Sequence, residues 1–312
     1  MNNYTKLMLL GAMEGKNIQN TPLVLTATTT GAETLTLQTL TIATGKTVVV
    51  DWGDGNSNSY TGTGTRTHAY AGAGTWTVKF TNRIDITEID FRDAKFGGVI
   101  NGANPLPINL TYLRFQDLSG LTYNINNTLL PSGLNNLSLI NLLNLTYNAN
   151  TNPFPSNLTS LYLNYLPNLT YNVNTNPFPS GLIYLYLWNL PNMTWIINAA
   201  QPWPAGAPVV EIVNCPNVTC TAWTRNNTQS IRAENGYNET NVDAFVNAVW
   251  ANKANFTYAN PSLDLLGGSN VAPSGTFQAA SPPTTGKEKL YDLAHGNYTP
   301  AGPEWTVQFQ GM

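Results

Sequence analysis

A period of 24 residues runs through the middle of the chain. Four segments open on a leucine at this spacing, at Leu110, Leu134, Leu158 and Leu182. Two of them, 134–157 and 158–181, share the skeleton L-x-x-L-x-L-x-x-L-x-N-L-T-Y-N-x-N-T-N-P-F-P-S-N/G. The same apolar spacing extends upstream to Ile86 and, after one inserted residue, downstream to about 230. A fixed period of this length indicates stacked repeats, because one such turn cannot bury its apolar side alone. We therefore expect about six turns.

Each L-x-x-L-x-L segment predicts one short strand, with alternate side chains pointing inward. Stacked turns would pair these strands into a parallel sheet. The second half of the repeat is dense in proline and asparagine, which favour turns and extended backbone over helix. We therefore expect an irregular return side, with Phe154 and Phe178 pointing into the core.

Charged residues are scarce: they make up 10% of the chain, and none lies between Leu118 and Val210. Asparagines instead recur at the eleventh position of the repeats, at Asn144, Asn168, Asn192 and Asn217. Side-chain amides there can bond backbone groups of the adjacent turn. The net charge of −3, without a basic cluster, argues against nucleic acid as a partner. No apolar run reaches the ~20 residues of a membrane span.

The repeat skeleton resembles leucine-rich repeats. Its ninth position carries mostly leucine, where common repeats of that family carry asparagine or cysteine. The resemblance is therefore closer to the irregular, asparagine-rich repeats of bacteriophage proteins and of bacterial surface proteins of the Bacteroidetes type. It implies a mainly β fold, with a leucine-rich-repeat-like parallel β-solenoid over residues 83–228.

Residues 20–82 have a different texture, rich in threonine and valine. The segments DWGDG, HAY and GTWTVKF follow one another at 51–55, 68–70 and 74–80. Their order resembles a PKD-type immunoglobulin-like β-sandwich, a module that serves as a spacer or in adhesion. We expect residues 1–19, in front of it, to form an attachment arm.

The resemblance to PKD-type domains also offers Asp51 and Asp54 as calcium ligands. The same two residues suit a tight turn, in which Asp54 precedes Gly55 and Asp51 bonds the backbone. Both interpretations stay open at this point, and no metal site is otherwise expected.

The 24-residue period breaks after about residue 228. Residues 241–250 carry apolar side chains at helical spacing, and 287–295 predict a second helix that ends at Gly296. Strands are expected at 262–266 and 305–309. We expect residues 229–312 to form an α/β C-terminal cap on the solenoid, whose open end would otherwise be exposed.

Few side chains suit catalysis, because the chain has two histidines and two cysteines. Cys215 and Cys220 align with core positions of the preceding turn, although a local disulfide is the alternative. We expect no catalytic residues and no cofactor. Two carboxylate pairs, Glu88 with Asp90 and Glu211 with Glu234, are the residues on which a polysaccharide-degrading enzyme would have to depend.

The outward positions of the repeat strands carry the best candidate binding surface. Its residues are Tyr112, Arg114, Tyr162, Asn164, Tyr184, Tyr186 and Trp188. Aromatic rings beside amides suit carbohydrate, and tyrosine and tryptophan equally suit a protein interface. A third interpretation is that cross-strand aromatic contacts only stabilise the sheet.

Together the two resemblances imply a non-enzymatic structural or decoration protein of a bacteriophage, similar to a head fibre or tail fibre, on the virion surface. Other virion proteins would bind its N-terminal region, and a host-surface glycan or protein would bind the repeats; self-association is left open. Residues 1–16 contain no recognisable signal peptide, which favours this setting. The alternative is an extracellular adhesin on a bacterial cell surface.

Overall fold

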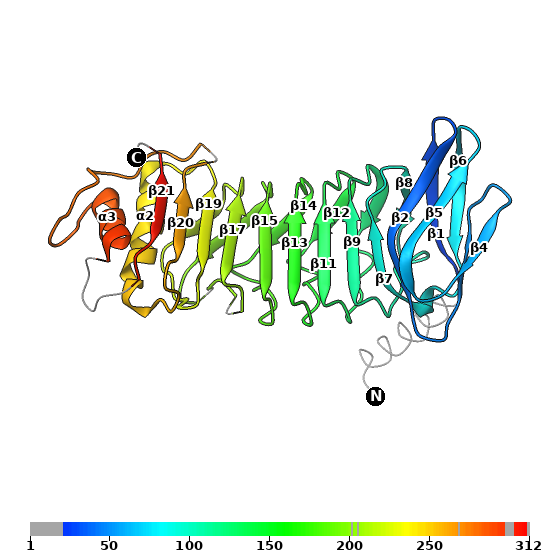
Figure 1. Cartoon of the computed structure of the whole chain (residues 1–312), viewed down its shortest axis with the longest axis horizontal. Helices are drawn as coiled ribbons and strands as arrows, with labels where there is room; N and C mark the ends of the chain where they lie inside the picture. The colour runs from blue at the N-terminus through cyan, green and yellow to red at the C-terminus, as the bar shows by residue number, and fades with distance from the viewer. Residues whose placement is uncertain (1–20, 201, 205, 268, 297–302, 311–312) are drawn as a thin grey trace. The chain divides into compact units, whose positions relative to one another are not determined.

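The protein is mainly β, with 40% strand and 10% helix, and contains a β-solenoid of about six turns with a period of about 24 residues. The computed structural model describes residues 21–200, 202–204, 206–267, 269–296 and 303–310. The attachment arm expected at residues 1–19 lies outside them. The chain forms two compact units, Met1–Asn157 and Leu158–Met312, each of which is described by itself (Figure 1).

The described part of the first unit, from residue 21, contains twelve strands and one short 3-10 helix. In chain order they are β1 (Leu23–Thr29), β2 (Glu33–Ile42), β3 (Val48–Asp51), β4 (Ser57–Tyr60), β5 (Thr63–Tyr70), β6 (Gly74–Phe80), η1 (Arg83–Asp85), β7 (Ile86–Phe91), β8 (Phe96–Ile100), β9 (Tyr112–Gln116), β10 (Gly120–Asn124), β11 (Asn136–Ile140) and β12 (Leu145–Asn148). The six N-terminal strands pair antiparallel, whereas the solenoid strands from β7 onward pair parallel with one another.

The N-terminal strands join both sheets of the first unit. One sheet has the order β11-β9-β7-β2-β5, and the other has the order β12-β10-β8-β1-β6-β3-β4. Strand β2 therefore pairs with the first outward solenoid strand, β7, and β1 pairs with the first return strand, β8. The backbone edges at this end of the solenoid are hydrogen-bonded to the N-terminal strands, and so they are not left open.

Among its described residues, the second unit contains nine strands, two α-helices and a short 3-10 helix. They are β13 (Ser160–Asn164), β14 (Leu169–Asn172), β15 (Tyr184–Trp188), β16 (Met193–Ile197), β17 (Val209–Val213), β18 (Val218–Cys220), β19 (Ser230–Glu234), α2 (Glu239–Ala251), η2 (Lys253–Asn255), β20 (Ser262–Leu265), α3 (Gly286–His295) and β21 (Thr306–Phe309). The outward strands form a sheet in the order β21-β20-β19-β17-β15-β13. It extends beyond residue 228 through β19, a strand that the sequence did not indicate.

The return side of the solenoid is more regular than expected. Its L-T-Y-N segments form short strands, so β18, β16 and β14 make a second sheet in unit 2. In β14, Leu169 and Tyr171 are buried while Thr170 between them is exposed. This alternation is that of a strand with one face on the core. The sequence did not indicate these short strands, whereas the proline-rich part that follows carries no strand, as expected.

The aromatic residues of the return side fill the core. Phe154 and Phe178 are buried, as predicted. Each packs edge-on against a buried tyrosine of its own turn, with ring centroids 5.2 Å apart for Tyr147 and Phe154 and 5.0 Å apart for Tyr171 and Phe178. Such edge-to-face pairs are a preferred arrangement of aromatic rings.

Three of the eleventh-position asparagines link their turn to the one before it, as the sequence indicates. The side-chain Nδ2 of each donates to a backbone carbonyl of the preceding turn, in the pairs Asn144 to Ser119 (2.7 Å), Asn192 to Pro167 (2.7 Å) and Asn217 to Pro191 (2.9 Å). These bonds satisfy loop carbonyls that have no strand partner. A neutral amide thus does what an ion pair would do elsewhere, which explains how the turns hold together without charge.

The two predicted helices are present. In α2, which the Asn238 side chain caps at the Asn241 N–H, the apolar side is buried, and α2 lies against β18 and α3. Thr285 and Glu288 form a reciprocal capping box at the start of α3, and Gly296, with a φ of 60°, ends it. Among the described residues, no helix is both long and apolar enough to cross a membrane.

We call the hydrogen bonds of Asn144, Asn192 and Asn217 to the preceding turn the amide ladder. The amide ladder leads to a prediction about stability. Replacing Asn192 with alanine removes its bond to the Pro167 carbonyl and should lower the free energy of unfolding by about 0.5–1.5 kcal/mol. The matched control is Asn260→Ala, at an exposed asparagine outside the repeats. Urea unfolding of both variants measures the difference. Equal effects of the two substitutions would contradict a role of the ladder in stability.

Candidate functional site

Two neighbouring strands of the second unit present most of the candidate binding residues. Strands β13 and β15 pair in parallel, with Tyr162 opposite Tyr186 and Asn164 opposite Trp188. The leucines between these positions are buried, so the aromatic residues lie on the outward side of the sheet. We call Tyr162, Asn164, Tyr184, Tyr186 and Trp188 the aromatic face.

The centre of the aromatic face is a ring stack. The rings of Tyr162 and Tyr186 lie 4.5 Å apart at 10°, which is close to the ~4.8 Å spacing of adjacent strands. The stack is therefore a direct consequence of the strand register. Burial raises the pKa of the Tyr186 hydroxyl, and the charge of Glu211 raises it further, while a hydrogen bond with Tyr162 opposes both. Tyr184, at the start of β15, is 48% exposed.

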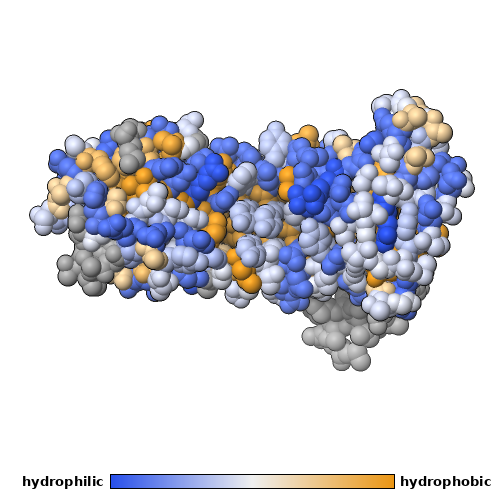
Figure 2. Space-filling view, viewed as in Figure 1, coloured by the Kyte–Doolittle hydropathy of each residue, from blue (hydrophilic) through white to orange (hydrophobic). Residues whose placement is uncertain are grey.

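Charged residues border the aromatic face on the side of β17 and β19. The indole N–H of Trp188 donates to Glu211 Oε2 at 3.0 Å, and the guanidinium carbon of Arg232 lies 5.8 Å from the Trp188 ring centroid. Arg232 also makes two hydrogen bonds to Glu234, at 2.6 and 3.1 Å. Figure 2 shows pale, intermediate hydropathy over β15 and stronger blue over the strands that follow. The Trp188 ring is thus held by polar contacts on this side.

The remaining two candidates lie in the first unit. Tyr112 and Arg114 are half-buried on β9, in register with Glu88 and Asp90 of β7. The Arg114 guanidinium donates to the side-chain oxygen of Gln116 on the same strand. The structure therefore places these two residues in a different compact unit from the aromatic face.

The carboxylates that a sugar-cleaving enzyme would need have other partners. Asp90 is buried and takes two hydrogen bonds from Arg92. Glu88 accepts the hydroxyl of Thr41 at 2.6 Å. Glu211 and Glu234 hold Trp188 and Arg232 as described above. Three of the four carboxylates thus bond an arginine or tryptophan side chain, and Glu88 bonds a threonine hydroxyl.

The sequence analysis missed a second ladder at the corner that follows each outward strand. The eighth residue of five turns has a positive φ of 51° to 58°; these corner residues are Asp117, Asn141, Tyr165, Asn189 and Asn214. Asparagine and aspartate tolerate this left-handed conformation better than other residues with a side chain. Their recurrence directly after the strands was the signal that could have identified the corner. Tyr165 departs from it and is 51% exposed.

The corner side chains also bond to one another. Asn141 Nδ2 donates to Asp117 Oδ1 at 2.8 Å in the first unit, and Asn214 Nδ2 donates to Asn189 Oδ1 at 2.9 Å in the second. The corner ladder thus runs beside the eleventh-position ladder and fixes the spacing between turns at a second point.

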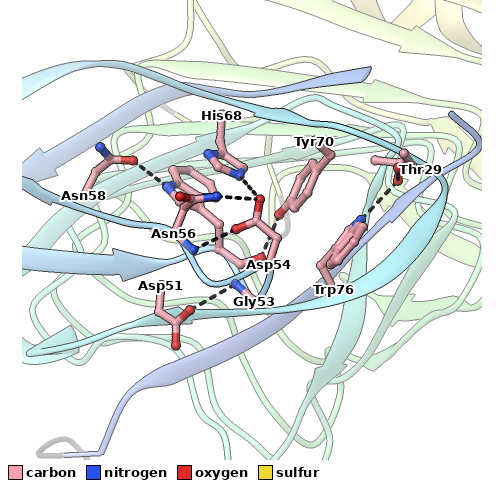
Figure 3. A network of polar contacts seen from close by, with 11 residues as sticks. Thr29, Asp51, Gly53, Asp54, Asn56, Asn58, His68, Tyr70 and Trp76 are labelled. Atoms are coloured by element: carbon pink, nitrogen blue, oxygen red, sulfur yellow. Dashed lines mark hydrogen bonds and ion pairs between the residues drawn. The ribbon is translucent and has the colours of Figure 1, made fainter. Parts of the chain in front are cut away.

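The residues of the WGDG segment converge in the first unit (Figure 3). Asp54 Oδ2 lies 2.8 Å from His68 Nε2, and Asp54 Oδ1 accepts the backbone N–H of Asn56 at 3.0 Å. Asp51 Oδ1 accepts the backbone N–H of Gly53 at 3.0 Å. Both aspartates therefore bond to the turn, and calcium binding by these two residues stays a prediction. Within the described residues, no three His, Cys, Asp or Glu side chains are grouped as metal ligands would be.

An aromatic cluster surrounds this turn. The buried Trp52 ring stacks on His68, with centroids 4.8 Å apart at 4°, and the Tyr70 hydroxyl donates to the Trp52 carbonyl at 2.9 Å. Tyr70 stacks in turn on Trp76, at 5.0 Å. The residues that carry the resemblance in the sequence are thus one packed cluster in the structure.

Cys215 and Cys220 are free and buried. Burial raises the pKa of both thiols to about 12. The structure therefore shows the core alternative and no local disulfide. Thiols with this pKa are poor nucleophiles and poor metal ligands at neutral pH.

No protein-family model, curated protein or solved structure matches the chain. What the protein does must therefore be argued from its own residues.

The Asp54–His68 contact generates a pH prediction. Burial alone would raise the pKa of Asp54, but hydrogen bonds from His68 and Asn56 outweigh it and hold the pKa below its usual value of 3.8. Because the unfolded chain then takes up the proton first as pH falls, the stability from Asp54 is present above about pH 4 and is lost below it. We expect Asp54→Asn to lower the melting temperature at pH 7, by a margin that shrinks between about pH 4 and pH 2.

Thermal unfolding of both proteins across this pH range measures the margin. Asp51→Asn is the control, because its carboxylate is 44% exposed and lies outside the aromatic cluster. A margin for Asp54→Asn that stays constant from pH 7 to about pH 2 would show that the charge of Asp54 adds no stability.

Proposed function

We propose that the chain is a non-enzymatic structural or decoration protein of a bacteriophage virion, similar to a head fibre or tail fibre, which binds a host-surface glycan or protein. The observation that carries the binding role is the aromatic face, in which exposed and half-buried rings are held in fixed positions by two paired strands. Tyrosine and tryptophan dominate the energetics of many binding surfaces because they bury a large area at little cost in side-chain entropy.

Preorganisation supports attachment over chemistry as the role of this face. The Tyr162 and Tyr186 rings already stack in the free protein, and the Trp188 indole is fixed by Glu211. A ligand therefore need not order these side chains, which lowers the entropic cost of binding. The carboxylates next to the face are likewise engaged in orienting contacts.

The virion setting rests on the sequence resemblances. The asparagine-rich repeats resemble those of phage proteins, and the WGDG region, which we assign as a PKD-type immunoglobulin-like sandwich over residues 20–82, is similar to spacer modules. The cluster of Trp52, Asp54, His68 and Tyr70 supports this assignment. Residues 1–19 would be the attachment arm to other virion proteins.

We also propose that residues 83–228 are the leucine-rich-repeat-like solenoid and that residues 229–312 are its cap. Supporting the cap, helix α2 lies against β18 and helix α3 against β21, the last strands of the two sheets of the second unit. Covering helices would protect the open strand edges from pairing with other chains.

The virion role predicts that the protein is present in purified particles. Mass spectrometry of virions banded in a density gradient should find it in every particle fraction and at constant stoichiometry with the capsid protein. Its absence from such particles would overturn the virion role, and its recovery on bacterial cell envelopes instead would favour the alternative, a cell-surface adhesin.

The binding role predicts the effect of a double substitution. Tyr186→Ala with Trp188→Ala removes the centre of the aromatic face and should weaken attachment to host cells at least tenfold, as loss of interface hot spots does. Because both side chains point outward, the melting temperature should stay within about 5 °C. Tyr258→Ala, at an exposed tyrosine outside the repeats, is the matched control. Attachment equal to that of the unsubstituted protein would contradict the role of this face.

A further inference from the structure

We propose that a hollow beside Tyr165 binds one sugar unit of a neutral glycan. The inference rests on the proposed binding function and names the class of its ligand. The hollow has a volume of about 320 Å³ and is lined by Tyr165, Pro167, Asn189, Pro191 and Asn214. It lies at the corners that follow β13, β15 and β17. Its volume is at the small end of the roughly 300–1,000 Å³ that ligand pockets span.

Tyr165 occupies a backbone position that disfavours it. Its φ is 52°, in the left-handed region where the other corner residues are asparagine or aspartate. A bulky residue there is a genuine outlier, and strain of this kind persists where function maintains it. Its ring is 51% exposed and makes no ring contact with any residue that the structure describes. Ring packing therefore does not compensate for the backbone strain at Tyr165.

The corner ladder is rerouted around Tyr165. At the other corners an asparagine donates to the corner residue of the preceding turn, as Asn214 does to Asn189 at 2.9 Å. Asn189 donates instead to Asn164 Oδ1, at 3.0 Å, one residue before Tyr165. The tyrosine side chain is thereby released from the ladder and stands free at the edge of the hollow. The left-handed backbone and the altered hydrogen bond of Asn189 both depart from the repeat at Tyr165, whose side chain is exposed. Departures from a local rule that meet at one residue indicate a functional site.

The lining matches the two sides of a sugar ring. The Tyr165 ring and the Pro167 and Pro191 side chains are apolar, and they suit the C–H face of a pyranose. Asn189 and Asn214 each donate one of their two side-chain N–H groups to an asparagine oxygen of the preceding turn. The second N–H group of each can donate to a ligand hydroxyl. No described residue donates to Asn214 Oδ1, so this oxygen can accept a hydroxyl proton. Amides beside a ring thus offer both donors and an acceptor.

The absence of charged side chains from the lining of the hollow favours neutral ligands over charged ones. None of the five lining residues is a carboxylate, a lysine or an arginine. An acidic glycan or a phosphate group would need a cation here to offset its desolvation, whereas a neutral sugar needs none. A basic ligand would likewise find no counter-charge. The lining therefore favours neutral hexose or N-acetylhexosamine units.

Tyr165→Asn is the decisive variant, because it restores the residue type that the repeat uses at this corner. We expect it to weaken binding at least tenfold to immobilised neutral oligosaccharides of glucose, mannose, galactose or N-acetylglucosamine. We also expect its melting temperature to rise by about 1–3 °C, since the left-handed strain is relieved. A merely structural role for Tyr165 would not combine a loss of binding with a gain in stability. The matched control is Tyr258→Asn, which should leave binding unchanged.

Four outcomes decide the proposal. Binding of a neutral oligosaccharide that is lost in Tyr165→Asn and kept in Tyr258→Asn supports it. No binding to any of these sugars overturns it, and so does equal binding by the unsubstituted protein and Tyr165→Asn. Selective binding of a proline-rich peptide or of an acidic glycan at Tyr165 also overturns it.

The sugar subsite and the proposed function can fail separately. Attachment to host cells that depends on Tyr186 and Trp188, without any sugar binding, overturns the subsite and leaves the proposed function standing. Loss of sugar binding in Tyr165→Asn, with cell attachment unaffected by changes in the aromatic face, supports the subsite and contradicts the role of that face.

Discussion

Hydrogen bonds from side-chain amides to the turn before them are the interaction on which this structure depends. A stacked turn leaves loop carbonyls without strand partners, and in a segment without charges neutral side chains can satisfy them. Asn192 reaches the Pro167 carbonyl, 25 residues earlier in the chain, and Asn144 reaches Ser119 over the same separation. Each bond sets the distance and the register between two turns at once.

The register then determines the chemistry of the surface. Because β13 and β15 pair residue for residue, Tyr162 lies against Tyr186 and Asn164 against Trp188. In the next strand Glu211 lies opposite Tyr186, and from there its carboxylate accepts the indole N–H of Trp188. A shift by one residue would exchange the outward rings for inward leucines. The proposed binding function and the sugar subsite at Tyr165 are therefore both consequences of a register held by amides.

Side-chain spacing in the sequence was enough to predict the inward leucines, the buried Phe154 and Phe178, the amide ladder of the eleventh-position asparagines, and the two helices. Each of these follows from a periodicity or a cap that the letters show directly. The return strands were missed because four residues such as L-T-Y-N are too short to establish an alternation. The left-handed corners were missed because they depend on backbone angles, and only their asparagines hint at them. Tyr112 and Arg114 belong to a different unit from Tyr186. This division is a property of the tertiary structure, which local sequence patterns do not predict.

The central claim is that the turns stack because their contacts repeat at one fixed spacing, and removal of one whole turn tests it most directly. Deleting residues 134–157 joins Gly133 to Leu158 and keeps every leucine and asparagine in phase. Deleting only residues 134–145 puts them out of phase. Thermal unfolding followed by circular dichroism should show one cooperative transition for the first deletion and none for the second. Equal loss of cooperative unfolding in both, or its retention in both, would contradict the account.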